Sequence, residues 1–154
     1  MSLPAWSLKP FSELSAREFH DIVQLRVDVF VVEQSCIYPE LDGADVLSST
    51  LHLQGLVAGE LVAYARLLDT ENTDPQGPIR IGRVLTRADH RGTGLGREMM
   101  QHLLIELDRR YPLRPVKLSA QVVVVDFYRS LGFTTFGPDY VEDGIQHIDM
   151  ELGK

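Results

Sequence analysis

Apolar residues follow helical spacing in some parts of the chain and strand-like spacing in others. In the first helical stretch four of them recur on one face: Phe19, Ile22, Val23 and Phe30. The sequence SARE just before them has the form of a capping box, in which Ser15 caps the helix and Glu18 reaches back. The pattern therefore predicts a helix from Ser15 to about Gln34.

Short segments with period-two alternation, bounded by turn residues, predict six strands. They fall at residues 49–57, 61–68, 79–86, 116–121, 133–142 and 145–152. The turn-rich segment 69–78 is expected to be a loop. Adjacent strands joined by AGE and EDG are expected to form hairpins.

Two further helices are expected between these strands. Residues 94–111 show apolar positions at every fourth residue, and two prolines follow soon after. Residues 122–132 are ambiguous, because four successive valines favour a strand whereas Gly132 suits a helix C-cap; we predict a helix. The order α-ββ-β-α-β-α-ββ predicts a mixed α/β domain around one twisted sheet.

Composition limits the class of protein. The chain has 154 residues, 44% hydrophobic and 24% charged, as expected for one globular domain over residues 1–154. No apolar run approaches the roughly 18 residues of a membrane span, and the N-terminus lacks a secretory signal pattern. A single cysteine, Cys36, excludes an internal disulfide. We expect a cytoplasmic protein that does not bind membranes, as a monomer or a homodimer.

Charge narrows the choice of partner. The formal net charge of −7 argues against nucleic acid, because a phosphate backbone requires a positive surface. Five of the fifteen basic residues nevertheless lie between positions 80 and 97: Arg80, Arg83, Arg87, Arg91 and Arg97. Such a cluster in an acidic chain indicates an anion site, with a solvated charged face as the alternative.

The sequence RGTGLG, residues 91–96, lies where a strand is expected to end and a helix to begin. A helix N-terminus offers free N–H donors and a partial positive charge, and glycines let the backbone approach phosphate oxygens closely. A Walker loop would require a lysine, and a Rossmann loop would require glycine where Arg97 stands. The segment predicts a phosphate site of another type, with a plain tight turn as the alternative.

Two motifs resemble the GCN5-related N-acetyltransferase (GNAT) superfamily. Residues 91–96 match R/Q-x-x-G-x-G/A, the pyrophosphate loop for coenzyme A, and residues 128–133 match Y-x-x-x-G-F. The segments LRVDVFVVEQSCIYPELDGAD, LVAYARLL, IGRVLT and YVEDGIQHIDM resemble the ElaA-like subfamily, so that the likeness spans roughly residues 10–152. LRVDVF also resembles, faintly, the N-terminal region of acyl-homoserine-lactone synthases.

The resemblance implies a fold and an acyl donor. The fold is a mixed twisted sheet of about six to seven strands, splayed between strands 4 and 5 and flanked by about four helices. The donor is acetyl-CoA, whose pantetheine arm would be bonded by the backbone of Val84, Leu85 and Thr86. Its pyrophosphate would be held by the following residues: Arg91, Gly92, Thr93, Gly94, Leu95, Gly96 and Arg97. The family's asparagine near the end of the fifth strand is Gln121 here, so its bond to the donor is expected to differ.

The resemblance also implies a role for Tyr128. It matches the family's tyrosine, which protonates or orients the thiolate that leaves when the acyl group is transferred. A core aromatic residue on a helix is the alternative.

The base that deprotonates the amine is not fixed by the resemblance. Arg26 and Glu33 fall on the apolar face of the first helix, where a charge must be paired or line a cavity. A structural ion pair and a substrate contact are both compatible with that position. Asp42 lies in a loop expected to overhang the acyl group, with Asp-Gly turn chemistry as its alternative. Glu33 and Asp42 are our candidates for catalysis, and Arg26 for substrate contact.

His52 and His147 lie opposite the apolar faces of their strands. They are candidates for substrate contact, or else structural histidines. No histidine spacing indicates a metal site, so we expect none. A covalent route through Cys36 would require a histidine partner, and none is near it in sequence.

These features together predict an acetyl-CoA-dependent N-acyltransferase that transfers an acetyl group directly to the primary amine of an unidentified small molecule or peptide. A non-catalytic acyl-CoA-binding regulatory module is the main alternative. A synthase of the acyl-homoserine-lactone type, which would use S-adenosylmethionine, is a third hypothesis that the chain length and the Y-x-x-x-G-F signature disfavour.

Overall fold

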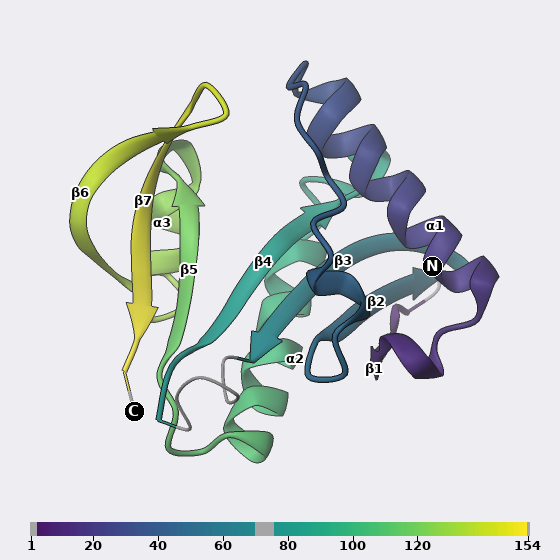
Figure 1. The fold of residues 1–154 in the computed structure, drawn as a ribbon, viewed down its shortest axis with the longest axis horizontal. Helices are drawn as coiled ribbons and strands as arrows, with labels where there is room; N and C mark the ends of the chain where they lie inside the picture. The colour runs from purple at the N-terminus through teal and green to yellow at the C-terminus, as the bar shows by residue number, and fades with distance from the viewer. Residues whose placement is uncertain (1–2, 70–75, 154) are drawn as a thin grey trace.

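The computed structural model describes residues 3–69 and 76–153, so most of the predicted loop 69–78 lies outside the described residues. The described residues form a seven-stranded sheet in the order β1-β2-β3-β4-β5-β7-β6 (Figure 1). Its strands are β1 (Ala5–Pro10), β2 (Leu51–Val57), β3 (Glu60–Asp69), β4 (Ile79–Thr86), β5 (Val116–Gln121), β6 (Thr134–Glu142) and β7 (Ile145–Leu152). β4 and β5 pair in parallel, and the other neighbours pair antiparallel. The predicted mixed twisted sheet is confirmed.

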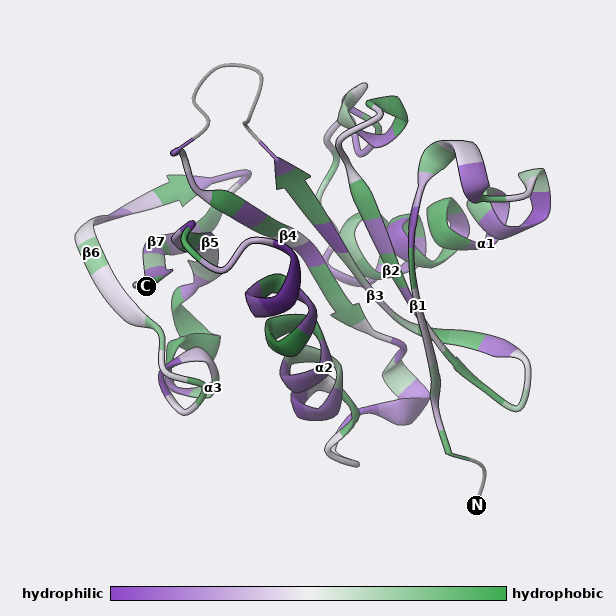
Figure 2. Ribbon diagram, turned by 90° about the horizontal axis from the view of Figure 1, so that it is seen from below, coloured by the Kyte–Doolittle hydropathy of each residue, from purple (hydrophilic) through white to green (hydrophobic). Residues whose placement is uncertain are grey.

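Helices cover both faces of the sheet. α1 (Ala16–Arg26) lies on one face, whereas α2 (Leu95–Arg110) and α3 (Val125–Arg129) lie on the other (Figures 1 and 2). The predicted capping box starts α1: the Glu18 N–H donates to Ser15 Oγ at 3.0 Å, and the Ser15 N–H donates to Glu18 Oε1 at 3.0 Å.

The first helix does not stay regular to Gln34 as predicted. After Arg26 it widens into a π-helical segment, Val27–Glu33. The wider turn rotates the later residues, so Arg26 and Glu33 do not share one face. The Arg26 side chain is fully buried, whereas 41% of the Glu33 side chain is exposed. Wide turns of this kind are often found at functional sites.

The hydrophobic pattern does not predict β1, because only Trp6 and Leu8 alternate between two prolines. Its place in the sheet depends on packing instead. Trp6 pairs with Gly55 of β2, and a Cβ at Gly55 would lie 2.4 Å from the Trp6 ring. The missing side chain of Gly55 thus makes room for the tryptophan.

The helix predicted over 122–132 is shorter than expected. Residues Val122–Val124 form a 3₁₀ turn, and the α-helix itself spans Val125–Arg129. Of the four valines only Val125 is buried. The other three are exposed to solvent in the 3₁₀ turn, rather than lying in an α-helix or a strand.

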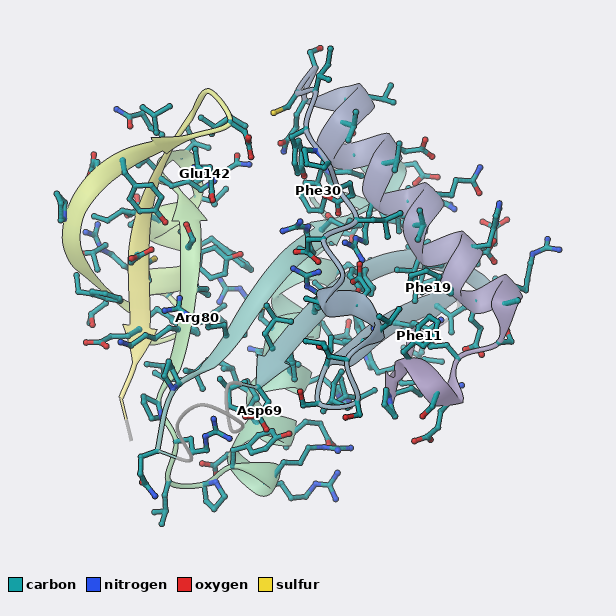
Figure 3. All side chains as sticks on the ribbon, in the orientation of Figure 1. Phe11, Phe19, Phe30, Asp69, Arg80 and Glu142 are labelled. Atoms are coloured by element: carbon teal, nitrogen blue, oxygen red, sulfur yellow. The ribbon has the colours of Figure 1, made fainter. Side chains whose placement is uncertain are left out.

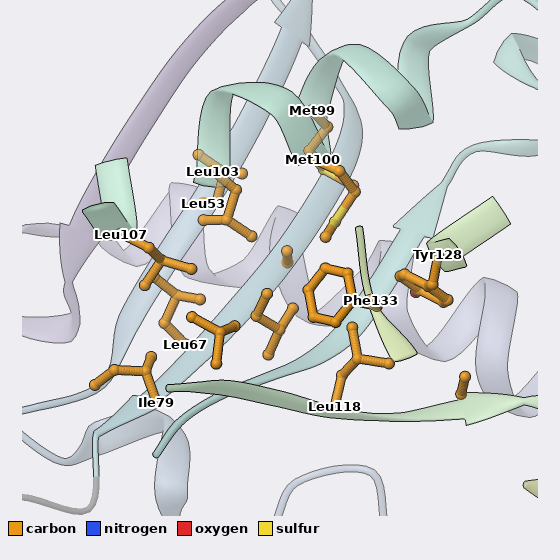
Figure 4. Close-up of a cluster of buried hydrophobic side chains, with 14 of the residues drawn as sticks. Leu53, Leu67, Ile79, Met99, Met100, Leu103, Leu107, Leu118, Tyr128 and Phe133 are labelled. Atoms are coloured by element: carbon orange, nitrogen blue, oxygen red, sulfur yellow. The ribbon is translucent and has the colours of Figure 1, made fainter. Parts of the chain in front are cut away.

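Two clusters of buried apolar side chains pack the helices against the sheet. The larger lies between α2, α3 and the sheet (Figure 4). Its fully buried side chains include Leu53, Met99, Leu103, Leu107 and Phe133, and burial of each contributes about 1.5–3 kcal/mol. The smaller cluster lies under α1 and joins Ile22, Leu25 and Val29 to Tyr64 and Leu85. Strand β4 is thus packed from both faces where it leaves β5.

Candidate functional site

β4 and β5 pair over only three residues and then diverge. The pairs run from Ile79↔Val116 to Ile81↔Leu118, although the strands continue to Thr86 and Gln121. Figure 1 shows the opening between β4 and β5. A cleft of about 900 Å³ lies there, within the size range of small-molecule sites. The predicted splay between strands 4 and 5 is confirmed.

A β-bulge in β4 accompanies the divergence. The β3–β4 register shifts so that two residues, Arg83 and Val84, oppose the single residue Ala65. Arg83 takes a positive φ of 53°, an uncommon conformation for a residue with a side chain. A bulge of this kind bends its strand and re-aims a side chain. Here the Arg83 side chain reaches the loop after α1, where it binds Glu40.

Beyond the bulge, β4 presents an edge to the cleft. Leu85 and Thr86 pair with β3 on one side, and the described pairing with β5 has already ended at Ile81. Val84, Leu85 and Thr86 all line the cleft. Their backbone groups on this edge are therefore free of a neighbouring strand and can bond an extended ligand.

The segment of residues 91–97, which we call the glycine loop, comprises the end of the connection from β4 and the first residues of α2. Gly92 and Gly94 adopt φ values of +75° and +85°, which strain any residue with a side chain. A Cβ at either position would meet nothing within 4 Å, so the glycines are required for their conformation rather than for space. Six of the loop's residues line the cleft: Arg91, Gly92, Gly94, Leu95, Gly96 and Arg97. Thr93 does not, and instead its hydroxyl donates to the His90 carbonyl at 2.8 Å.

The first turn of α2 faces the same space. Gly94 caps the helix without a side-chain hydrogen bond, so no side chain of the cap occupies the first N–H groups. A helix end of this type attracts an anion through its N–H donors and its dipole.

Two arginines flank the glycine loop. The Arg91 guanidinium donates to both carboxylate oxygens of Glu33 and to the Thr86 carbonyl at 3.1 Å. Arg97 donates to Ser130 Oγ at 2.7 Å and lies over the ring of Phe127. Glu33 therefore lines the cleft, as a partner of Arg91.

Tyr128 lies inside the cleft on α3. Its ring packs edge-on against Phe127 and Phe133, and 8% of the residue is exposed. Burial raises the pKa of the Tyr128 hydroxyl to about 12, because desolvation disfavours the phenolate. The hydroxyl therefore keeps its proton near neutral pH and can donate it.

The opposite end of the cleft rests on an ion-pair network that we call the arginine cluster. It comprises Arg26, Arg66 and Arg83 with Glu40, Asp42 and Asp45. Arg26 binds Glu40 at 2.7 Å and Asp45 at 2.6 Å, with no part of its side chain exposed. Of the two interpretations open for Arg26, the geometry is that of a structural ion pair, and Arg26 does not line the cleft.

Asp42 lines the cleft but is bound on both oxygens. Arg66 donates to Asp42 Oδ1 and Oδ2 at 2.9 Å each, and the Ala44 N–H donates to Oδ1 at 3.1 Å. The hydrogen bonds from Arg66 lower the pKa of Asp42 to about 2. A carboxylate with that pKa is a poor acceptor for an amine proton.

The two strand histidines lie in different places. His52 is fully buried, accepts a hydrogen bond from the Tyr64 hydroxyl at 2.6 Å and donates to the Asp45 carbonyl at 2.9 Å. Burial lowers the pKa of His52, so the ring is a neutral structural link outside the cleft. His147 and Gln121, by contrast, both line the cleft.

Cys36 lines the cleft as well, and its thiol contacts the Asp143 carbonyl at 3.2 Å. Within residues 3–69 and 76–153, no three histidine, cysteine, aspartate or glutamate side chains gather as metal ligands would. In the same residues no helix is long and apolar enough to cross a membrane.

Neither Glu40 nor Arg66 was predicted from the sequence as a member of the site, and Arg83 was expected only in a basic cluster that binds an anion, not as a partner of Glu40. Arg66 sits in the apolar strand sequence LVAYARLL, where a charge at a buried position signals a partner. The sequence does not indicate that Glu40 and Arg83 are partners. They lie 43 positions apart, and only the loop that carries Glu40 and the bulge at Arg83 bring them together.

Comparison with known proteins shows which family this chain resembles. The family model described as acetyltransferase (GNAT) domain matches residues 18–154. The protein ElaA of Escherichia coli strain K12 is 41% identical over 145 residues, or 94% of each chain. The crystal structure of Escherichia coli ElaA has a TM-score of 0.91 at 38% identity, covering 97% of this chain and 99% of that one.

Two other solved structures show how far the likeness extends. A crystal structure described as an acyl-CoA N-acyltransferase from Pseudomonas aeruginosa has a TM-score of 0.92 at 39% identity, covering 98% of this chain and 100% of that one. The AHL synthase LasI has a TM-score of 0.78 at 16% identity, covering 99% of this chain and 90% of that one. The likeness to LasI shows a shared fold alone.

Proposed function

The chain belongs to the GNAT acetyltransferase family, among its ElaA-like members, and we propose that it transfers an acetyl group from acetyl-CoA directly to the primary amine of a small molecule or peptide. As a member of this family it is an N-acyltransferase. The proposal adds three points: the donor is acetyl-CoA, the acceptor is a primary amine, and the acetyl group is transferred directly.

The observation that carries the proposal is the continuous path from the free edge of β4 to the glycine loop. An extended arm with amide groups would lie along residues 84–86 like an added strand. Its pyrophosphate would then reach the first turn of α2, where the αL glycines leave the N–H groups open. A cleft of about 900 Å³ is large enough for the pantetheine arm and an acyl group.

Individual residues take the following roles in this proposal. Backbone groups of Val84, Leu85 and Thr86 bond the pantetheine amides. Backbone N–H groups of residues 91–97 hold the pyrophosphate, with added charge from Arg91 and Arg97. Gln121, at the end of β5, contacts the donor from the other side of the cleft.

The chemistry is acyl transfer through a tetrahedral intermediate. The neutral amine attacks the thioester carbonyl, so the C–N bond forms and the C–S bond then breaks. A backbone N–H of β4 near Leu85 stabilises the oxyanion. The Tyr128 hydroxyl gives its proton to the leaving thiolate and recovers a proton from the nitrogen that has attacked.

Glu33 and Asp42, the carboxylates expected to act in catalysis, receive positioning roles. Both oxygens of Glu33 bind Arg91, and both oxygens of Asp42 bind Arg66. Each carboxylate thus orients an arginine beside the cleft. An acidic chain with net charge −7 also favours the approach of a cationic amine.

The test of transfer is thiol release from acetyl-CoA over a panel of primary amines. The panel would contain diamines, amino-acid esters and short peptides with a free N-terminus or a lysine. We expect release above the rate without amine, together with acetylated acceptor by mass spectrometry. Acetyl-CoA binding without release on any amine would instead support the non-catalytic module.

The direct route is tested separately, without an amine. Cys36 lies in the cleft, so a covalent route would leave an acetyl group on its sulfur. We expect the intact mass of the protein to be unchanged after incubation with acetyl-CoA alone. An acetyl adduct that maps to Cys36 and is discharged by an active amine would contradict direct transfer.

A further inference from the structure

His147 lines the end of the cleft between the β6–β7 hairpin and the π-helical segment Val27–Glu33, which we assign to the acceptor and call the acceptor end. It lies on β7 directly beside Gln121, the last residue of β5, and 13% of its side chain is exposed. Its ring thus faces the cleft from β7. The neighbouring strand β5 ends at the position where the donor is expected. Figure 3 shows the two walls of this end, with Glu142 at the tip of the β6–β7 hairpin and Phe30 across the opening.

A backbone contact fixes the tautomer of the His147 ring. His147 Nδ1 lies 2.7 Å from the Ile145 carbonyl oxygen. Because a carbonyl can only accept, Nδ1 must hold the hydrogen and donate it. In the neutral ring the lone pair is therefore on Nε2.

The orientation of the ring is held as well. His147 stacks on Tyr140, with the ring centroids 6.0 Å apart and an interplanar angle of 18°. Tyr140 is itself fixed, since its hydroxyl donates to Asp149 Oδ1 at 2.7 Å and contacts Ser119 Oγ. Nε2 lies 4.0 Å from Glu142 Oε2, beyond hydrogen-bond distance, so its lone pair is available to a substrate.

Two other carboxylates that line the cleft have arginine partners, whereas Glu142 lies toward the solvent with 58% of its side chain exposed. Asp42 and Glu33 are each bound by an arginine on both oxygens. The Tyr38 hydroxyl donates to Glu40 at 2.7 Å. Tyr140 stacks on the ring and binds Asp149. The other titratable groups that line the cleft with His147 are Glu33, Cys36, Tyr38, Asp42, Arg83, His90, Arg91, Arg97, Tyr128, Glu142 and Asp143.

We propose that His147 is a catalytic residue whose Nε2 accepts the proton that the attacking ammonium group must lose. This assignment rests on the function proposed above. The ammonium gives one proton to Nε2, and the neutral amine then forms the C–N bond of the tetrahedral intermediate, from which the C–S bond breaks. The second nitrogen proton passes through Tyr128 to the thiolate, and the imidazolium releases its proton to water past Glu142, whose side chain is 58% exposed.

The kinetic test compares the wild type with His147→Ala and His147→Gln at saturating amine. The wild-type kcat should fall along an acid limb as the pH is lowered, because a protonated base cannot accept the proton of the ammonium group. Both variants should lose that limb and show a kcat lower by about 100-fold, the lower range of general-base effects. Added imidazole should restore part of the rate of His147→Ala but not of His147→Gln, whose side chain fills the space.

The control variant is His20→Ala, because His20 is exposed on α1 and lies outside the cleft. It should keep the rate and the pH profile of the wild type. Both His147 variants should also keep the rise in melting temperature with acetyl-CoA, which establishes that they fold and bind the donor. An active wild type whose His147 variants keep the acid limb would overturn this assignment alone.

The tautomer gives a readout that does not depend on turnover. The ¹⁵N chemical shifts of the neutral His147 ring should show hydrogen on Nδ1 and a lone pair on Nε2. Hydrogen on Nε2 would overturn the assignment even in an active enzyme. A wild type that releases no thiol with any amine would contradict the proposed function itself, and the role of His147 with it.

Discussion

The two ends of the cleft are built from different parts of the chain. The donor end consists of backbone: the edge of β4, two αL glycines and the first turn of α2. The acceptor end consists of side chains: the arginine cluster below one wall and the fixed ring of His147 on the other. A backbone surface depends on local conformation, whereas a side-chain surface depends on contacts between distant segments.

This difference has consequences for substitution. At Gly92 and Gly94 of the glycine loop an added Cβ meets no atom within 4 Å, so we expect the damage to be confined to the backbone conformation and to anion binding. At the arginine cluster each charge has two partners of opposite sign, and four of the six residues are buried, so the loss of a buried charge leaves its partners uncompensated. We expect the first kind of change to alter binding and the second to alter stability.

The largest effect is expected at Arg26. Arg26→Met removes the fully buried guanidinium and leaves Glu40 and Asp45 without one of their partners. Such changes cost about 3–5 kcal/mol, measurable as the free energy of unfolding in urea. The matched control is Arg17→Met, whose side chain is 87% exposed beside Asp21 and should cost under about 1 kcal/mol. Equal losses in the two variants would contradict the structural role of the cluster.

The next effect is on donor binding. Gly94→Glu places a side chain and a negative charge at an αL position of the glycine loop, and it should weaken acetyl-CoA binding by about 100-fold, or about 2.7 kcal/mol. Gly59→Glu is the control, because Gly59 has a φ of +82°, has no atom near its Cβ position and lies in the β2–β3 turn. Both variants should lose about 1–2 kcal/mol of stability. Calorimetric titration with acetyl-CoA should show weaker binding for Gly94→Glu than for Gly59→Glu. Similar affinities of the two variants would contradict donor binding at the glycine loop.

A smaller effect is expected on turnover alone. Tyr128→Phe removes the hydroxyl whose pKa burial raises to about 12, and with it the proton donor for the thiolate. We expect kcat to fall by about tenfold, or about 1.4 kcal/mol, with unchanged acetyl-CoA affinity. The control Tyr111→Phe alters a tyrosine packed against Arg114 outside the cleft and should keep the wild-type rate. A full rate in Tyr128→Phe would remove the tyrosine from the mechanism.

The smallest effect concerns acid stability. Hydrogen bonds from Arg66 lower the pKa of Asp42 to about 2 in the folded chain, below the ordinary value of about 3.9. A depressed carboxyl pKa stabilises the fold above the unfolded value and loses that contribution as pH falls from about 4 to about 2. The free energy of unfolding of Asp42→Asn should therefore fall less steeply over that window than that of the wild type. Parallel pH profiles would show that Arg66 does not bind Asp42 in this way.

Much of the donor end could be predicted from the sequence. Residues 79–86 and 116–121 were expected as strands and form β4 and β5 over those bounds, because their alternation is local. The capping box and the start of α2 beside Gly94 are also local signals. Motifs of this kind encode backbone geometry within a few residues, so they can be recognised without a fold.

The acceptor end could not be predicted in the same way. Arg66 and Asp42 lie 24 positions apart in sequence, and only the folded sheet brings them together. Because the helix widens into a π-helix after Arg26, Glu33 binds Arg91 instead of lying on the apolar face. No local sequence pattern predicts this widening. His147 was named from the sequence as a candidate for substrate contact, but the tautomer on which its proposed role as a base depends is set by a backbone contact to Ile145. Contacts such as these follow from tertiary structure.

The most direct test of the donor site is the melting temperature of the wild-type protein with increasing acetyl-CoA. A ligand that binds only the folded state at 100 times its Kd adds about 2.7 kcal/mol to stability. For a chain of this length each kcal/mol raises the melting temperature by about 2–4 °C. We predict a rise of several degrees that grows with the logarithm of the acetyl-CoA concentration above its Kd and that free CoA also produces. A melting temperature that does not change at millimolar acetyl-CoA would contradict a coenzyme A site between β4 and β5.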